Sequence, residues 1–243
     1  MSLDFRAAHH LPKVRGDGGA DPAGLPRQRR GTTPQMHGRY PDYDCLEQAG
    51  HWDERTRRVV LDRVARVPEL RFFDAREAAA LAAFCDVVLA QDDDPRVPVL
   101  AFVDEKLAAG RLDGFRYVGM PDDRETWRHV ARGLDEAARA RGGAALADAD
   151  DACRNGVVDD FAEGRLTGGA WDAVDATLAF KVVMRGVLAA FYAHPWAWNE
   201  IGFGGPAYPR GYARLGVGLS EAFEGAEAID LDPVRDVQER GLE

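Results

Sequence analysis

The chain has 243 residues, of which 46% are hydrophobic, and this apolar content excludes a disordered or disulfide-stapled chain because it is sufficient to form a buried core. The formal net charge is −10, with seven Arg and Lys against three Asp in residues 1–39 and 24 against 38 in the rest of the chain. Such an acidic globular part repels phosphate backbones, so nucleic acid is not expected as a partner.

The N-terminal arm, residues 1–38, is expected to be disordered, because it is rich in Gly and shows no hydrophobic periodicity. It lacks the roughly 7–15-residue apolar core of an export signal. The pair Arg29-Arg30 is followed by Gly31-Thr32-Thr33-Pro34 and does not match a twin-arginine signal. No stretch of the chain reaches the roughly 18 apolar residues of a spanning helix, so direct membrane insertion is not expected.

Six helices are predicted from hydrophobic spacing and capping signals. The second is the best marked, because Asp74 and Glu77 have the spacing of a capping box. The predicted helices span residues 53–67, 74–89, 98–109, 122–140, 148–163 and 171–192. Strand-like alternation is almost absent, so we expect an all-α fold, a single irregular bundle over residues 39–225 followed by an acidic tail at 226–243.

The segment 191–212 differs from the rest of the chain, with seven aromatic residues, three Pro and four Gly. Glycine is needed where a backbone turns at positive φ or approaches another segment closely, so the composition predicts a rigid aromatic and Gly-rich loop. Trp, Tyr and Arg also dominate protein–protein hot spots. Two interpretations stay open: the loop docks a partner, or Trp196, Trp198 and Tyr208 cap the core of the chain itself.

The same segment resembles the C-terminal signature of the gluconate 2-dehydrogenase subunit 3 family. The resemblance rests on His194-Pro195-x-Ala197-Trp198-x-Glu200-Ile201-Gly202-Phe203-Gly204-Gly205-Pro206-Ala207-Tyr208-Pro209-Arg210-Gly211-Tyr212. Upstream features agree with it, namely Phe72-Phe73-x-x-x-Glu77, Cys85-Asp86 before the acidic loop 92–94, and Val103-Asp104. The similarity extends from about Arg39 to Glu224.

The resemblance implies a non-catalytic accessory subunit. Its partner would be a glucose-methanol-choline-type flavoprotein that oxidises sugars, sugar acids or other alcohols, with a cytochrome c subunit as a further candidate. FAD and haem are then expected in the partner subunits and no cofactor in this chain. The residues expected to bind the partner are His194, Pro195, Trp198, Glu200, Gly202, Gly204, Gly205, Pro206, Tyr208, Pro209, Arg210, Gly211 and Tyr212. Localisation stays open between the periplasm or membrane surface, reached through a partner, and the cytoplasm.

The sequence offers few residues for independent redox chemistry. Gly202-x-Gly204-Gly205-Pro206 lacks the strand–turn–helix context of a dinucleotide site. Haem attachment and iron–sulfur motifs are missing from the sequence, and Cys45, Cys85 and Cys153 match no zinc spacing.

The alternative is an independent metal-assisted hydrolase that uses His194, Glu200 and the acidic loop Asp92–Asp94. Against it, a His-Pro step at a helix end is typical of a C-terminal cap, where the helix dipole favours imidazolium. The three aspartates lack the Gly and distal Glu of a calcium-binding loop and suit a solvated acidic turn.

Overall fold

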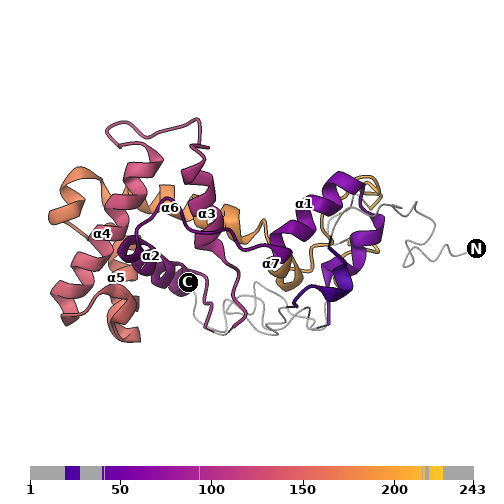
Figure 1. Cartoon of the computed structure of the whole chain (residues 1–243), viewed down its shortest axis with the longest axis horizontal. Helices are drawn as coiled ribbons and strands as arrows, with labels where there is room; N and C mark the ends of the chain where they lie inside the picture. Colours follow the sequence, from indigo (N-terminus) through magenta and orange to yellow (C-terminus); the bar gives the residue numbers. More distant parts are fainter. Residues whose placement is uncertain are drawn as a thin grey trace, which may run out of the picture. The chain divides into compact units, whose positions relative to one another are not determined.

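The computed structural model describes residues 20–27, 40, 42–92, 94–214, 216 and 219–226 (Figure 1). All regular elements within these ranges are helices, which confirms the predicted all-α class. None of the helices in the described ranges is long and apolar enough to cross a membrane. The chain divides into two compact units: unit 1 is Met1–Arg66 together with His194–Glu243, and unit 2 is Val67–Ala193.

Unit 2 contains five α-helices and two short 3-10 helices. They are α2 (Ala75–Val88), α3 (Val99–Ala108), α4 (Asp123–Gly142), η4 (Leu146–Asp148), α5 (Asp151–Ala162), η5 (Gly169–Ala173) and α6 (Ala176–Phe191). The long helix α4 packs against α2, α5, α6 and η5. In the core, the ring of Phe161 lies 5.0 Å from that of Trp171 and 5.7 Å from that of Phe84. These apolar contacts supply most of the driving force for folding of this unit.

Aspartate caps set where the helices begin. The carboxylates of Asp53, Asp74, Asp122, Asp150 and Asp175 each accept hydrogen bonds from backbone N–H groups in the first turn of their helices. Each such cap contributes about 1 kcal/mol to helix stability. The capping box of Asp74 and its partner Glu is formed, as predicted.

The sixth predicted helix is interrupted near its start. The sequence pattern places its beginning at Trp171, but Trp171 lies in η5 and α6 begins after the cap Asp175. Val174 between them is extended, with φ −144°, so the helix has to restart at the next residue that can cap it.

Unit 1 is built from η2 (Pro22–Gly24), η3 (Cys45–His51), α1 (Glu54–Ala65) and α7 (Pro195–Glu200). The sequence pattern assigns the helix at 53–67 to the same bundle as the others, whereas α1 packs against η3 and α7 within unit 1. In this packing the apolar residues Val60, Leu61 and Val64 of α1 are buried.

Part of the predicted disordered arm packs on unit 1. The guanidinium of Arg27 forms an ion pair with Asp44, and the indole Nε1 of Trp196 donates to the carbonyl of Pro26 at 3.2 Å. Residues 20–27 therefore contact the folded unit. The remainder of the arm, and the predicted acidic tail from residue 227 onward, lie outside the described residues.

Candidate functional site

The signature segment 194–212 opens with helix α7, and His194 is the N-terminal cap of that helix. Its Nδ1 accepts a hydrogen bond from the backbone N–H of Trp196 at 3.2 Å. Only 1% of the residue is exposed. The pKa of His194 is lowered to about 4, chiefly by burial; a hydrogen bond with the backbone of Arg63 opposes this shift and the nearby charge of Arg63 adds to it. The expectation of an imidazolium at a helix C-terminus is therefore wrong: the ring is neutral, because an accepting nitrogen is required at this cap.

Helix α7 is tied to η3 by hydrogen bonds from Cys45. The backbone N–H of Cys45 donates to Asn199 Oδ1 at 2.8 Å, and its thiol donates to the carbonyl of Pro195 at 3.4 Å. Trp198 is 5% exposed and packs edge-on against Phe203, with ring centroids 5.4 Å apart. The helix thus turns its aromatic side chains into unit 1.

Three signature glycines allow close contacts within unit 1. A Cβ on Gly202 would lie 2.6 Å from the ring of Tyr40, and one on Gly205 would lie 2.5 Å from the indole of Trp52. A Cβ on Gly204 would lie 2.4 Å from the carbonyl oxygen of Phe223. Gly202 and Gly205 also have positive φ, at 67° and 76°, which L side chains rarely adopt.

The same contacts determine what the glycine cluster can bind. The glycines follow the C-terminal end of α7, whereas a phosphate site requires the positive end of a helix dipole at its N-terminus. The space beside each Cα is filled by protein atoms. The cluster therefore serves packing within unit 1.

Arg210 fastens the loop that follows the glycines. Its guanidinium donates to the carbonyls of Gly204 at 3.0 Å and Pro206 at 3.2 Å, and to Gln48 Oε1 at 3.1 Å. It also lies over the ring of Phe223. The sequence predicts Arg210 as a partner contact, and within unit 1 its two terminal nitrogens donate to groups of its own chain.

The described part of the C-terminal segment, residues 219–226, covers the glycines. The backbone N–H of Gly225 donates to the carbonyl of Gly202 at 2.7 Å, and the hydroxyl of Tyr43 donates to the carbonyl of Phe223 at 2.7 Å. Burial raises the pKa of Tyr43 well above its usual range, so this hydroxyl stays protonated and remains a donor.

Two aromatic side chains of the signature remain exposed. Tyr208 is 69% exposed and Tyr212 is 48% exposed, and we call these two residues the tyrosine surface. The other predicted site residues separate into three groups. His194, Pro195, Trp198, Gly202, Gly204 and Gly205 are buried, Glu200, Pro206 and Arg210 are half-buried, and Pro209 and Gly211 are exposed.

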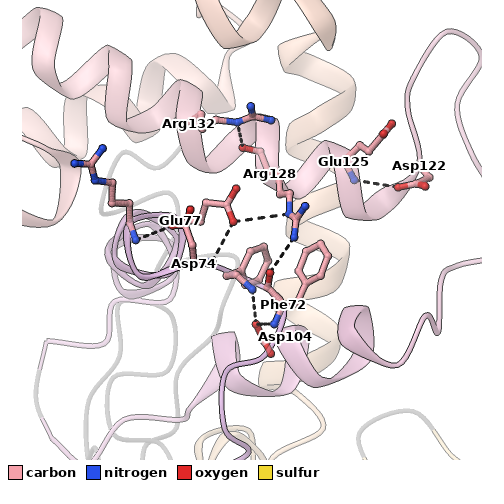
Figure 2. Close-up of polar contacts among 10 residues, drawn as sticks. Phe72, Asp74, Glu77, Asp104, Asp122, Glu125, Arg128 and Arg132 are labelled. Atoms are coloured by element: carbon pink, nitrogen blue, oxygen red, sulfur yellow. Dashed lines mark hydrogen bonds and ion pairs between the residues drawn. The ribbon is translucent and has the colours of Figure 1, made fainter.

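In unit 2, a buried carboxylate organises the turn before α2. Asp104 of α3 is fully buried and accepts hydrogen bonds from three consecutive backbone N–H groups, those of Arg71 at 2.7 Å, Phe72 at 3.0 Å and Phe73 at 2.9 Å (Figure 2). From α4, Arg128 donates to the carbonyl of Phe72 at 3.1 Å and its guanidinium lies over the ring of Phe72. Phe72, Phe73 and Asp104 belong to the motifs of the family resemblance, which assigns them no role. A lone Asp on an apolar helix face is the sequence signal that could have revealed the role of Asp104.

A family model described as gluconate 2-dehydrogenase subunit 3 matches residues 75–205, more than half of the chain. The chain belongs to the gluconate 2-dehydrogenase subunit 3 family. Neither the comparison with curated proteins nor that with solved structures gives a match.

The family match begins at the first residue of α2 and ends at Gly205. It therefore includes Asp104 and the signature glycines, whereas Tyr40, Trp52 and Phe223, which fill the space beside those glycines, lie outside it. In this family member the matched segment contains the glycines whose backbone is closely approached. The segments on either side of the match contain the residues that pack against these glycines.

The residues of the alternative hydrolase are not assembled in one unit. His194 and Glu200 belong to unit 1, whereas Asp92 and Asp94 belong to unit 2, where Asp94 pairs with Arg96 at 3.3 Å. The Nδ1 lone pair of His194 is already used by the cap of α7. Asp93 is not among the described residues, and in the part of the chain that is described no group of three His, Cys, Asp or Glu side chains could hold a metal ion.

A cavity of about 270 Å³ lies between α2 and α4. Its lining alternates in charge, with Asp74, Arg76, Glu77, Ala131, Arg132, Asp135, Glu136 and Arg139. Its carboxylates accept structural hydrogen bonds, since Asp135 binds the backbone N–H of Leu146 at 2.9 Å and Glu136 that of Ala170 at 2.9 Å. Glu77 accepts a hydrogen bond from the backbone N–H of Asp74 at 3.2 Å and lies 3.8 Å from Arg128 (Figure 2). The charges that line this cavity hold helix ends in place.

Proposed function

We propose that this member of the gluconate 2-dehydrogenase subunit 3 family is a non-catalytic accessory subunit. It would bind and stabilise a glucose-methanol-choline-type FAD dehydrogenase that acts on sugars, sugar acids or other alcohols. FAD would reside in that partner and haem in a cytochrome c subunit. The observation that carries the proposal is the signature segment, which is fastened internally and leaves only its tyrosine surface as large aromatic contact area.

The fastening of the segment supports a docking role. Arg210 and the buried glycines hold the backbone on either side of Tyr208 in place, so binding would not have to order a mobile loop. Tyrosine buries a large area with few rotatable bonds, and a pre-organised loop loses little entropy on association. Tyr208 is 69% exposed and Tyr212 is 48% exposed, although the ring of Tyr212 also lies 6.0 Å from that of Phe223.

The packing of the glycine cluster supports the assignment of FAD to the partner. Tyr40, Trp52 and Phe223 occupy the space that a pyrophosphate would need beside the glycines. A subunit that binds only the folded partner stabilises it by mass action, with an effect that grows with the concentration of the subunit.

The test is co-expression with a glucose-methanol-choline-type flavoprotein from the same genome. The full chain should co-purify with the flavoprotein and raise its melting temperature. The variant Tyr208→Ser/Tyr212→Ser should fold normally and bind at least tenfold more weakly. The control Val59→Ser/Leu70→Ser removes two side chains of similar exposure, 53% and 46%, outside the signature and should bind like the wild type. Failure of the wild-type chain to bind would refute the proposed function.

A further inference from the structure

Unit 2 carries a second exposed apolar surface, formed by the loop between α3 and α4 and by one face of α6. In Figure 1 this loop arches away from the two helices that it joins. Val118 is 99% exposed, Phe115 53% and Leu112 39%, while α6 contributes Tyr192 at 49% and Leu188 at 40%. We call these five residues the unit 2 apolar surface.

Arg185 connects the two parts of this surface. Its Nε donates to Asp113 of the loop at 2.8 Å, and its guanidinium lies 5.7 Å from the ring centroid of Phe115. Leu188 and Tyr192 follow Arg185 by three and seven positions on α6, which places them on the same helix face. The loop and the exposed face of α6 are therefore neighbours.

The loop is held in one conformation by Asp113. Its carboxylate accepts hydrogen bonds from Lys106 Nζ at 2.6 Å and from Arg185, and its backbone N–H donates to Asp123 Oδ2 at 3.1 Å. Phe115 and Tyr117 stack edge-on, with centroids 4.9 Å apart. The apolar side chains are thus presented to solvent by a braced loop, and Val118 adds nothing to the core of its own unit.

Cationic side chains gather around the unit 2 apolar surface. Arg111 and Arg116 of the loop and Lys181 of α6, one turn before Arg185, form no ion pair within the described residues. Of the two carboxylates in the loop, Asp113 is paired with Lys106 and Arg185, and Asp122 caps the N-terminus of α4. This cationic rim stands out in a chain of net charge −10.

We propose that the unit 2 apolar surface binds the dehydrogenase subunit at an apolar hollow with an acidic rim. This inference rests on the proposed function and adds a second contact to the tyrosine surface. Exposed apolar patches bordered by polar groups mark interaction sites, and opposite charges at the rim speed association and fix orientation. We favour a protein partner over an anionic bilayer. The chain has a net charge of −10, so an anionic lipid surface would attract only the few cations at the contact and would repel the rest of the chain.

The experiment compares the affinities of full-length variants for the flavoprotein partner at low salt. Phe115→Ser/Val118→Ser should raise the dissociation constant at least tenfold, and the charge reversal Arg116→Glu should raise it severalfold, mainly through slower association. The matched controls are Val59→Ser/Leu70→Ser for the apolar pair and Arg55→Glu for the charge, and both should bind like the wild type. Arg116 is exposed, so Arg116→Glu should fold normally. It still tests the surface if Phe115→Ser/Val118→Ser has a lowered melting temperature.

Three outcomes would overturn the inference. If the wild-type chain binds the flavoprotein and both unit 2 variants bind equally well, the surface is not part of the interface although the proposed function stands. If the same variants instead abolish sedimentation with phosphatidylglycerol vesicles and leave flavoprotein affinity intact, the surface contacts lipid. If the wild-type chain does not bind, the proposed function fails first and this inference with it.

Discussion

The guanidinium of Arg210 lies over the ring of Phe223, with Cζ 3.7 Å from the ring centroid. This contact joins the family signature to a segment beyond the family match, because Phe223 also covers Gly204. The same guanidinium binds two carbonyls of the signature loop. Arg210 therefore stabilises the internal structure of unit 1, whereas Tyr208 and Tyr212 beside it are exposed.

Replacing Arg210 should destabilise the protein before it affects binding. Arg210→Ala removes three hydrogen bonds and the contact with Phe223, and we expect a loss of about 2–4 kcal/mol in the free energy of unfolding, measured with urea. Arg210→Lys should recover less than half, because a single ammonium cannot reach both carbonyls and stack on the ring. Tyr208→Ala should change stability by less than about 0.5 kcal/mol. Equal stability of Arg210→Ala and wild type would contradict this role.

Asp104 is expected to be a stability determinant of unit 2. Asp104→Asn keeps the shape but removes the charge and one of the two accepting oxygens, so at least one buried N–H of the turn at 71–73 loses its partner. The expected cost is about 2–3 kcal/mol, with a larger cost for Asp104→Ala. Thermal unfolding monitored by circular dichroism measures it, with the exposed Asp172→Asn as the matched control. A wild-type melting temperature for Asp104→Asn would refute the assignment.

The buried neutral ring of His194 predicts loss of stability in mild acid. In the unfolded chain the imidazole takes up a proton below its ordinary pKa of about 6.5, whereas in the folded chain it does so only near 4. Unfolding is therefore increasingly favoured as the pH falls from about 6.5 to 4, by up to about 3 kcal/mol in total.

The control for this pH dependence is His194→Asn, which keeps an oxygen that accepts the Trp196 N–H but removes the titrating ring. Its stability curve should be flatter than that of the wild type between pH 6.5 and 4. Parallel curves for the two proteins would show that other groups cause the acid sensitivity.

The N-terminal arm should contribute to stability through Arg27. Its partner Asp44 is 4% exposed, and removal of Arg27 leaves that carboxylate buried without its ion pair. We expect Arg27→Ala to lower the free energy of unfolding by about 1–3 kcal/mol. Deletion of residues 1–38 should cost at least as much, although composition alone predicts a neutral deletion. An unchanged melting temperature for both proteins would place the arm outside the folded unit.

The sequence was sufficient to predict the helices of unit 2, because Asp caps and apolar stripes are local signals. It did not reveal that residues 195–200 form α7, since the glycines and prolines around them suggest a loop. It also failed to separate packing from docking in the signature. In the sequence, Gly202 and Arg210 are equally plausible as partner contacts. The structure shows that Gly202 lies against Tyr40 and that Arg210 lies over Phe223, and both of these neighbours are distant in the chain.

We expect this chain to bind a flavoprotein and the flavin to reside in that partner. The most direct measurement is size-exclusion chromatography of the co-expressed pair with absorbance recorded at protein and flavin wavelengths. The account predicts a colourless isolated chain without dehydrogenase activity toward gluconate, glucose or other polyols, and a yellow complex that contains both chains. Stoichiometric flavin in the isolated chain, or separate elution of the two proteins, would contradict it.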